Sequence, residues 1–142
     1  MRWILRGKDY PFTMRIAQEN LPEDHKWYLD DWRNSNHRFF IVLEDGVDEA
    51  LGFYAYNVHN LRISHLYVFK KEMKIDVLCS MINHGMCLTY NFQGQVRTGV
   101  RVENDSPFKA VLRHIMEVYG FELDREDERF TDYRGGYIKC VE

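Results

Sequence analysis

The 142-residue sequence predicts one domain, residues 1–142, of the mixed α/β class with a partly antiparallel sheet. Three apolar runs of strand length follow one another with short turn-forming segments between them, as in an antiparallel meander: 38–44, 51–58 and 61–69. The period then changes to that of a helix, because Ile75, Leu78, Ile82 and Met86 share one helical face. The alternating strand 96–102 follows, and a helix between two strands allows a parallel crossover.

The N-terminal part predicts a strand and two helices. Residues 2–6 form the strand, which Gly7 ends, and a first helix runs to about Asn20. Pro22 favours the start of a second helix, since proline is tolerated in a first turn. Trp27, Tyr28 and Trp32 would give that helix an aromatic face.

The last predicted helix has start and stop signals at both ends. Ser106 is the expected cap, Pro107 the first helical residue and Gly120 the stop. Its apolar stripe is Phe108, Val111, Leu112, Ile115 and Tyr119. Strands at 121–123 and 137–141 follow, with a charged loop containing Arg134-Gly135-Gly136 between them. The predicted order is β-α-α-β-β-β-α-β-α-β-β.

Composition restricts the class of protein. A net charge of −3 argues against general nucleic-acid binding, which needs a positive surface. No apolar stretch reaches the roughly 20 residues of a membrane span, so no membrane partner is expected. Three cysteines without a CxxC pair predict reduced thiols in a cytoplasmic protein. The six histidines show no ligand spacing with the cysteines, so no metal is expected.

Three local motifs carry a resemblance to a known family. Leu66-Tyr67-Val68 ends the strand before the central helix, Val102-Glu103-Asn104 ends the next strand, and Glu117 to Phe121 reads Glu-Val-Tyr-Gly-Phe. With the order of elements, these segments resemble the GNAT (GCN5-related N-acetyltransferase) superfamily over essentially the whole chain. The same residues also have a purely structural explanation, as core residues, a turn former and a helix stop.

The resemblance implies a mixed sheet with an acyl-CoA site between the fourth and fifth strands. In this family those strands diverge, and the pantetheine arm of acetyl-CoA lies along the exposed main chain of the fourth strand, here Leu66, Tyr67 and Val68. Asn104 would lie near the cofactor. The acceptor would be an amine of a small molecule or a protein.

Two departures from the family are visible. The glycine-rich pyrophosphate loop is degenerate, because 69–76 contains no glycine. Lys70, Lys71 and Lys74 would lie where the phosphates lie, and they either offset phosphate charge or form a solvated loop. No base or acid is identifiable: strand alternation puts Ser64 on the acceptor face and turns His65 away unless a bulge intervenes. Met116 stands at the family's acid tyrosine, and Tyr119 lies one turn later. Ser64 and Tyr119 are the catalytic candidates.

Two functions follow from the sequence. The first is an acetyl-CoA-dependent N-acetyltransferase of unknown acceptor. The second is a non-catalytic GNAT-fold protein that binds another macromolecule, an accessory protein of a phage included. The acidic run 122–128 either attracts a cationic amine or is a solvated loop. The oligomeric state stays open, a dimer included.

Overall fold

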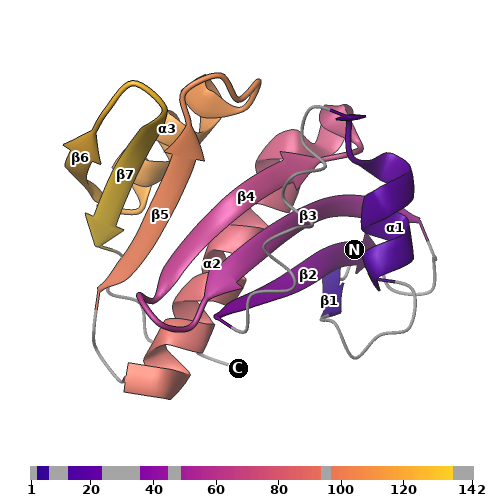
Figure 1. Ribbon diagram of the computed structural model, residues 1–142, viewed down its shortest axis with the longest axis horizontal. Coiled ribbons are helices and arrows are strands. Elements are labelled where there is room, and N and C mark those ends of the chain that lie inside the picture. The colour runs from indigo at the N-terminus through magenta and orange to yellow at the C-terminus, as the bar shows by residue number, and fades with distance from the viewer. Residues whose placement is uncertain (1–2, 7–12, 24–35, 45–48, 94–96, 136–142) are drawn as a thin grey trace.

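A computed structural model describes residues 3–6, 13–23, 36–44, 49–93 and 97–135 of the chain (Figure 1). The elements are β1 (Trp3–Arg6), α1 (Thr13–Asn20), β2 (His37–Glu44), β3 (Ala50–Asn57), β4 (Arg62–Val68), the 3₁₀ helix η2 (Lys71–Met73), α2 (Lys74–Gln93), β5 (Thr98–Glu103), α3 (Lys109–Val118), β6 (Glu122–Glu126) and β7 (Phe130–Gly135). The second predicted helix, beyond residue 23, and the predicted strand 137–141 lie outside the described residues.

One mixed sheet contains all the described strands. Its order is β1-β2-β3-β4-β5-β7-β6, and every neighbouring pair is antiparallel except the parallel pair β4–β5. The meander β2–β3–β4 and the crossover through α2 confirm the predicted mixed α/β class, because a parallel pair needs a long connection across the sheet.

The described helices lie on both faces of this sheet. Figure 1 shows α2 and α3 behind the sheet, while α1 lies in front of its β1–β3 half. The core between α2 and the sheet is fully buried and contains Val77, Leu78, Met81 and Ile82. Ile75, which the helical period placed on the same face, is 58% exposed in the first turn of α2. The predicted stripe is therefore correct from Leu78 onward.

Gly85 brings α2 close to β4. A Cβ atom at this position would lie 2.2 Å from Cδ1 of the buried Ile63, which is far below a van der Waals contact. A glycine inside a helix usually costs stability, but here it lets the helix approach the strand. This close approach sets the distance between α2 and β4, the strand that carries the candidate site.

The start of α3 differs from the prediction. Ser106 and Pro107 lie in a turn before the helix, and Phe108 occupies the cap position. Oγ of Ser106 accepts the backbone N–H of Phe108 at 3.1 Å. The serine thus stabilises a local turn rather than capping the helix, a common alternative for short hydroxyl side chains.

The predicted charged loop before residue 136 is wrong, because 130–135 forms β7 between β5 and β6. Thr131 and Gly135 are buried on one face of β7, whereas Asp132 and Arg134 lie on the other. The two charged side chains form ion pairs with Arg101 and Asp124. The charged residues of β7 are paired with residues of the neighbouring strands. Its composition therefore resembles that of a loop, although it is a strand.

Two further observations concern the chemistry of the chain. Cys79 is a free thiol, but Cys87 is disulfide-bonded, so the expectation of three reduced cysteines is wrong at Cys87. Within the described ranges, no helix combines the length and apolar character that crossing a membrane requires.

Candidate functional site

Strands β4 and β5 diverge soon after they meet. Their parallel pairing consists of Arg62 with Gly99 and Ile63 with Val100. Figure 1 shows the two strands separating toward their carboxyl ends. Among the described strand pairs, the pairing of β4 with β5 ends at Ile63 and Val100.

A bulge in β4 lies at the point of divergence. Ala55 of β3 pairs with Ser64 and Phe53 pairs with Tyr67, so two residues of β4, His65 and Leu66, oppose one residue of β3. His65 has a φ of 56°, which is uncommon for a residue other than glycine. The bulge changes the register, so His65 faces the same cleft as Ser64 rather than the opposite side.

This cleft has a volume of about 230 Å³ and lies on the sheet face opposite α2. Strand alternation gives that face Arg101 and Glu103 from β5 and Phe130 from β7. The full lining is His37, Arg62, Ser64, His65, Arg101, Glu103, Arg129 and Phe130. Four strands therefore contribute side chains, and most of those side chains are polar.

Positive charge dominates the cleft. Arg101 forms a bidentate ion pair with Asp132: its Nε donates to Oδ1 at 2.8 Å and its Nη2 donates to Oδ2 at 2.9 Å. This pairing raises the pKa of Arg101. The guanidinium groups of Arg101 and Arg129 lie 4.5 and 5.0 Å from the centre of the Phe130 ring. The Phe130 ring thus contacts two arginines of the cleft.

Arg62 is the third arginine of the cleft. Its Nε is buried and has no hydrogen-bond partner among the described residues. Burial lowers the pKa of Arg62, and the positive charge of Arg101 adds to that effect, while Asp132 opposes it. A cation with an unused donor therefore lines a cleft that already contains like charges.

The gap between the diverging strands is narrow. It adjoins the cleft through His65 and Arg101, and its volume is about 10 Å³, room for roughly one water molecule. Leu66 and Val102 line it from the two strands and Leu112 from α3. Tyr67 and Phe108 pack edge to face, with ring centres 5.3 Å apart, so that β4 also contacts the start of α3.

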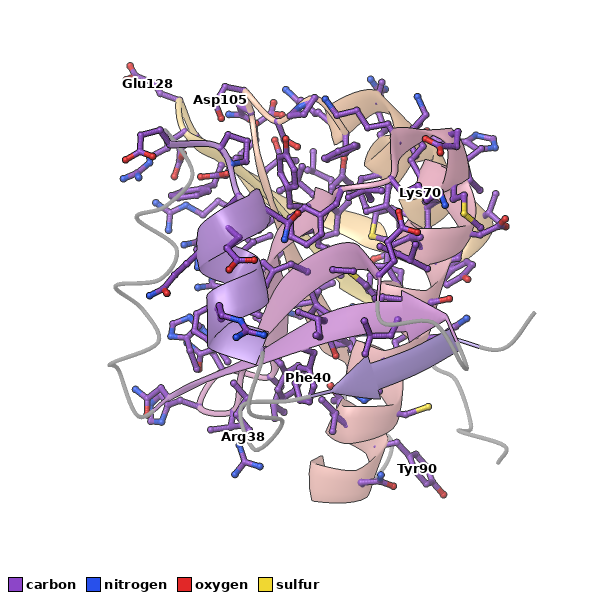
Figure 2. All side chains as sticks on the ribbon, turned by 90° about the vertical axis from the view of Figure 1, so that its right-hand side faces the viewer. Arg38, Phe40, Lys70, Tyr90, Asp105 and Glu128 are labelled. Atoms are coloured by element: carbon purple, nitrogen blue, oxygen red, sulfur yellow. The ribbon has the colours of Figure 1, made fainter. Side chains whose placement is uncertain are left out.

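The residues predicted to bind acetyl-CoA lie along β4 and at its carboxyl end. Leu66, Tyr67 and Val68 are buried in the bulged half of β4. Lys70 and Lys71 lie in or next to η2, Lys74 begins α2, and Nζ of Lys70 is 3.5 Å from Oε2 of Glu49. Figure 2 shows Lys70 at the same end of the molecule as Asp105 and Glu128, far from Tyr90 near the end of α2.

The side chain of Asn104 is occupied by the protein itself. Its Nδ2 donates to the carbonyl oxygen of Asp127 at 2.8 Å, and its Oδ1 accepts the Thr131 hydroxyl at 2.6 Å. Asn104 therefore joins the end of β5 to the β6–β7 turn.

The two catalytic candidates lie apart. Ser64 lines the cleft. Tyr119 ends α3 in the helical layer, where burial and then the Cys79 side chain of α2 raise the pKa of Tyr119 to about 12. Among the described residues, no three His, Cys, Asp or Glu side chains gather in a way that could hold a metal ion.

Comparisons with known proteins give the same architecture. Neither a family model nor a curated protein matches the sequence. Solved structures do match: a Desulfovibrio desulfuricans protein assigned to the GNAT acetyltransferases has a TM-score of 0.63 at 14% identity, with 96% of this chain and 100% of that chain covered. The chain has the GNAT fold.

Two further GNAT-fold neighbours were solved with ligands. A spermidine N-acetyltransferase from Vibrio cholerae, in complex with CoA and spermine, has a TM-score of 0.61 at 16% identity and covers 93% of this chain and 92% of its own. An N-acetyltransferase from Campylobacter jejuni, in complex with acetyl coenzyme A, has a TM-score of 0.56 at 15% identity, with 94% and 97% covered.

Sequence reasoning missed the group of arginines in the cleft. The polar alternation of Arg62 and Ser64 on β4 and of Arg101 and Glu103 on β5 was available as a signal. This signal is incomplete without β7, whose charged residues resemble those of a loop.

Proposed function

We propose that this GNAT-fold chain is an acetyl-CoA-dependent N-acetyltransferase whose acceptor amine binds in the cleft beside His65. The observation that carries the proposal is the bulge in β4 at the point where β4 and β5 diverge, because it brings a side chain suited to proton transfer into the cleft beside the diverging strands. Similar structures solved with CoA or acetyl-CoA support the choice of cofactor.

The chain offers acetyl-CoA a main-chain edge and a basic end. The β5-facing edge of Leu66, Tyr67 and Val68 would hold an extended arm by strand addition, and Lys70, Lys71 and Lys74 would offset phosphate charge. Bound acetyl-CoA supplies an acetyl thioester. The edge fits this group, but a gap of about 10 Å³ does not contain it. In this proposal the gap widens on binding, and the ring contact between Tyr67 of β4 and Phe108 before α3 opens with it.

His65 and Ser64 perform the proton chemistry in this proposal. An imidazole is the side chain that most often exchanges protons in general acid–base catalysis. His65 accepts a proton from the ammonium group of the acceptor, so that the amine becomes nucleophilic, and the Ser64 hydroxyl hydrogen-bonds the acceptor. Tyr119 has no part in this chemistry because it lies in the helical layer.

Calorimetry with acetyl-CoA, combined with an assay of CoA release over a panel of amines, tests the proposal. We expect replacement of Lys70, Lys71 and Lys74 by Glu to weaken acetyl-CoA binding by about tenfold or more, because charge-assisted contacts contribute roughly 1.5–3 kcal/mol each. The matched control replaces Arg97, Arg113 and Arg125 by Glu. These exposed arginines give the same change in net charge.

A second pair of variants isolates the proton step. His65→Gln should leave acetyl-CoA binding intact and abolish most of the transfer, whereas His114→Gln, at an exposed position of α3, should change neither. No binding at millimolar acetyl-CoA, together with no transfer to any amine, would overturn the proposal.

The filled gap favours a second candidate, a GNAT-fold protein that binds another macromolecule without catalysis. The Tyr67–Phe108 contact, the pairing of Lys70 with Glu49 and the occupied Asn104 side chain all suit a site that takes no cofactor. The same calorimetry decides between the two, because only the enzyme binds acetyl-CoA.

A further inference from the structure

Two imidazole rings of the cleft lie against two phenylalanine rings of the core. Phe39 of β2 and Phe53 of β3 are fully buried, and their rings stack with centres 5.3 Å apart and planes 18° apart. His37 of β2 and His65 of β4 line the cleft beside them. The wall of the cleft that carries His65 is therefore continuous with the core of the sheet.

The Phe39 ring contacts both imidazoles. The ring centre of His65 lies 6.3 Å from that of Phe39, with the planes 20° apart, and His37 lies at the same distance with an angle of 24°. The two imidazole centres lie 5.9 Å from each other. These distances are typical of offset-stacked aromatic pairs. One flat ring, itself stacked on Phe53, thus supports the two histidines of the cleft.

A small residue lets the rings meet across the strand between them. Phe39 of β2 pairs with Ala55 of β3, and Ala55 pairs with Ser64, the residue before His65. Strands β2 and β4 are two strand spacings apart, about 9.6 Å, whereas the ring centres of Phe39 and His65 are 6.3 Å apart. The two side chains therefore lean toward each other over the buried Ala55 methyl group.

The backbone of His65 depends on its surroundings. Its φ of 56° is left-handed, and such a conformation costs free energy in a residue with a Cβ atom, so it persists only where neighbouring contacts favour it. Regular alternation would turn the imidazole to the opposite face of the sheet, away from Phe39. The stacked contact is therefore present only with the bulge, and it favours the bulged conformation.

We propose that Phe39 is a positioning residue, whose ring fixes the plane of the His65 imidazole in the cleft. Phe39 contacts no ligand itself, because it is fully buried and does not line the cleft. The support of His65 by Phe39 is independent of the proposed function, whereas its effect on acetyl transfer rests on that function. A proton acceptor held in one orientation keeps the geometry that proton transfer requires, and a displacement of about 1 Å can cost a hundredfold in rate.

Kinetics of CoA release with acetyl-CoA and an amine acceptor test the effect on transfer. Phe39→Leu keeps an apolar side chain but removes the flat ring, so kcat should fall by about tenfold to a hundredfold while KM for the amine changes by less than about twofold. Phe39→Tyr keeps the ring and should keep most of kcat, with a loss of stability because its hydroxyl is buried. Phe121→Leu is the matched control, since it removes another buried ring, before β6, and should leave kcat unchanged.

Nuclear magnetic resonance tests the support of His65 without any substrate. The rings of His37 and His65 should give a nuclear Overhauser contact in the wild type, because both stack on Phe39. Phe39→Leu should weaken this contact, whereas Phe39→Tyr and Phe121→Leu should retain it. Thermal unfolding shows whether each variant is folded. If Phe39→Leu does not fold, Phe39→Met takes its place with the same expectations, because its flexible side chain fills the space without a flat face.

The outcomes separate this inference from the proposed function. A contact between the His37 and His65 rings that is absent in the wild type, or unaltered in a folded Phe39→Leu, would overturn the positioning role. So would a Phe39→Leu variant with the wild-type kcat, or one in which only KM changes. Absence of transfer by the wild type to any amine would overturn the proposed function instead, while loss of the ring contact in Phe39→Leu would still support Phe39 as the residue that orients His65.

Discussion

Acid should destabilise this protein through a half-buried histidine that packs against the core. His84 of α2 lies among aromatic side chains: the Tyr54 hydroxyl forms a hydrogen bond with its Nδ1, and the Phe40 ring packs edge-on with ring centres 4.7 Å apart. Burial lowers the pKa of His84 from 6.5 to about 4. The neutral imidazole is therefore the form that the folded protein favours.

The sign and size of the effect follow from linkage. Between the folded value of about 4 and the unfolded value of 6.5, the unfolded chain binds a proton that the folded chain does not. Stability therefore falls as the pH falls through this window. One unit of pKa difference corresponds to about 1.4 kcal/mol, so the whole window removes about 3 kcal/mol. That is a large part of the roughly 5–15 kcal/mol that stabilises an ordinary domain.

Urea unfolding at pH values from 7 to 4.5, followed by circular dichroism, measures this loss. His84→Gln should be less stable than the wild type at pH 7, because the Tyr54 contact is altered, but its stability should change little with pH in this window. His114→Gln, which removes an exposed histidine of α3, should keep the wild-type dependence. If wild type and His84→Gln lose stability in parallel, the burial of a neutral His84 is not the cause.

Three further predictions concern packing and the gap. Gly85→Ala should cost about 1–3 kcal/mol, because the new methyl group meets Ile63, and the penalty should shrink in the background of Ile63→Ala. Asp132→Asn should cost about 2–3 kcal/mol, because it breaks a half-buried two-pronged ion pair, whereas Asp124→Asn, at an exposed pair, should cost less than about 0.5 kcal/mol. Phe108→Val should tighten acetyl-CoA binding by about two- to tenfold, because binding no longer has to break the ring contact with Tyr67.

Each of these has a measurement and a contradicting result. Urea unfolding at pH 7 measures the first two. Additive costs of Gly85→Ala and Ile63→Ala would show that the two positions do not clash, and equal costs of the two aspartate variants would show that burial does not strengthen the Arg101 pair. Calorimetry measures the third, with Ile115→Ala as a control that weakens α3 away from the gap. Equal affinities of Phe108→Val and wild type would show that the ring contact does not limit entry.

The meander and the central helix could be predicted because their signals are periodic. Apolar residues alternate or cluster in β2–β4, and Leu78, Ile82 and Met86 mark one face of α2. Gly85, taken by local propensity alone, would only weaken that helix. Its purpose depends on Ile63, 22 positions earlier in the sequence, and no local pattern contains such a relation.

The candidate site could be predicted only in part, for a different reason. Alternation places Ser64 in the cleft correctly, but it turns His65 away, because the bulge depends on how β4 pairs with β3. A φ of 56° at a histidine has no sequence signature of the kind that glycine provides. The arginine group was missed because it needs β7 in place, and the charges of β7 resemble those of a loop until their partners on β5 and β6 are known.

The motifs and the chemistry of this chain therefore belong to different residues. Asn104 matches the family motif, yet both ends of its amide hold the β6–β7 turn against β5. Without that turn, β7 would not place Asp132 and Phe130 beside Arg101. A residue that matches the family motif can thus have a structural role in the sheet, while residues outside the motifs line the cleft. For this reason the likeness to known acetyltransferases describes the architecture, and it does not extend to the side chains that line the cleft.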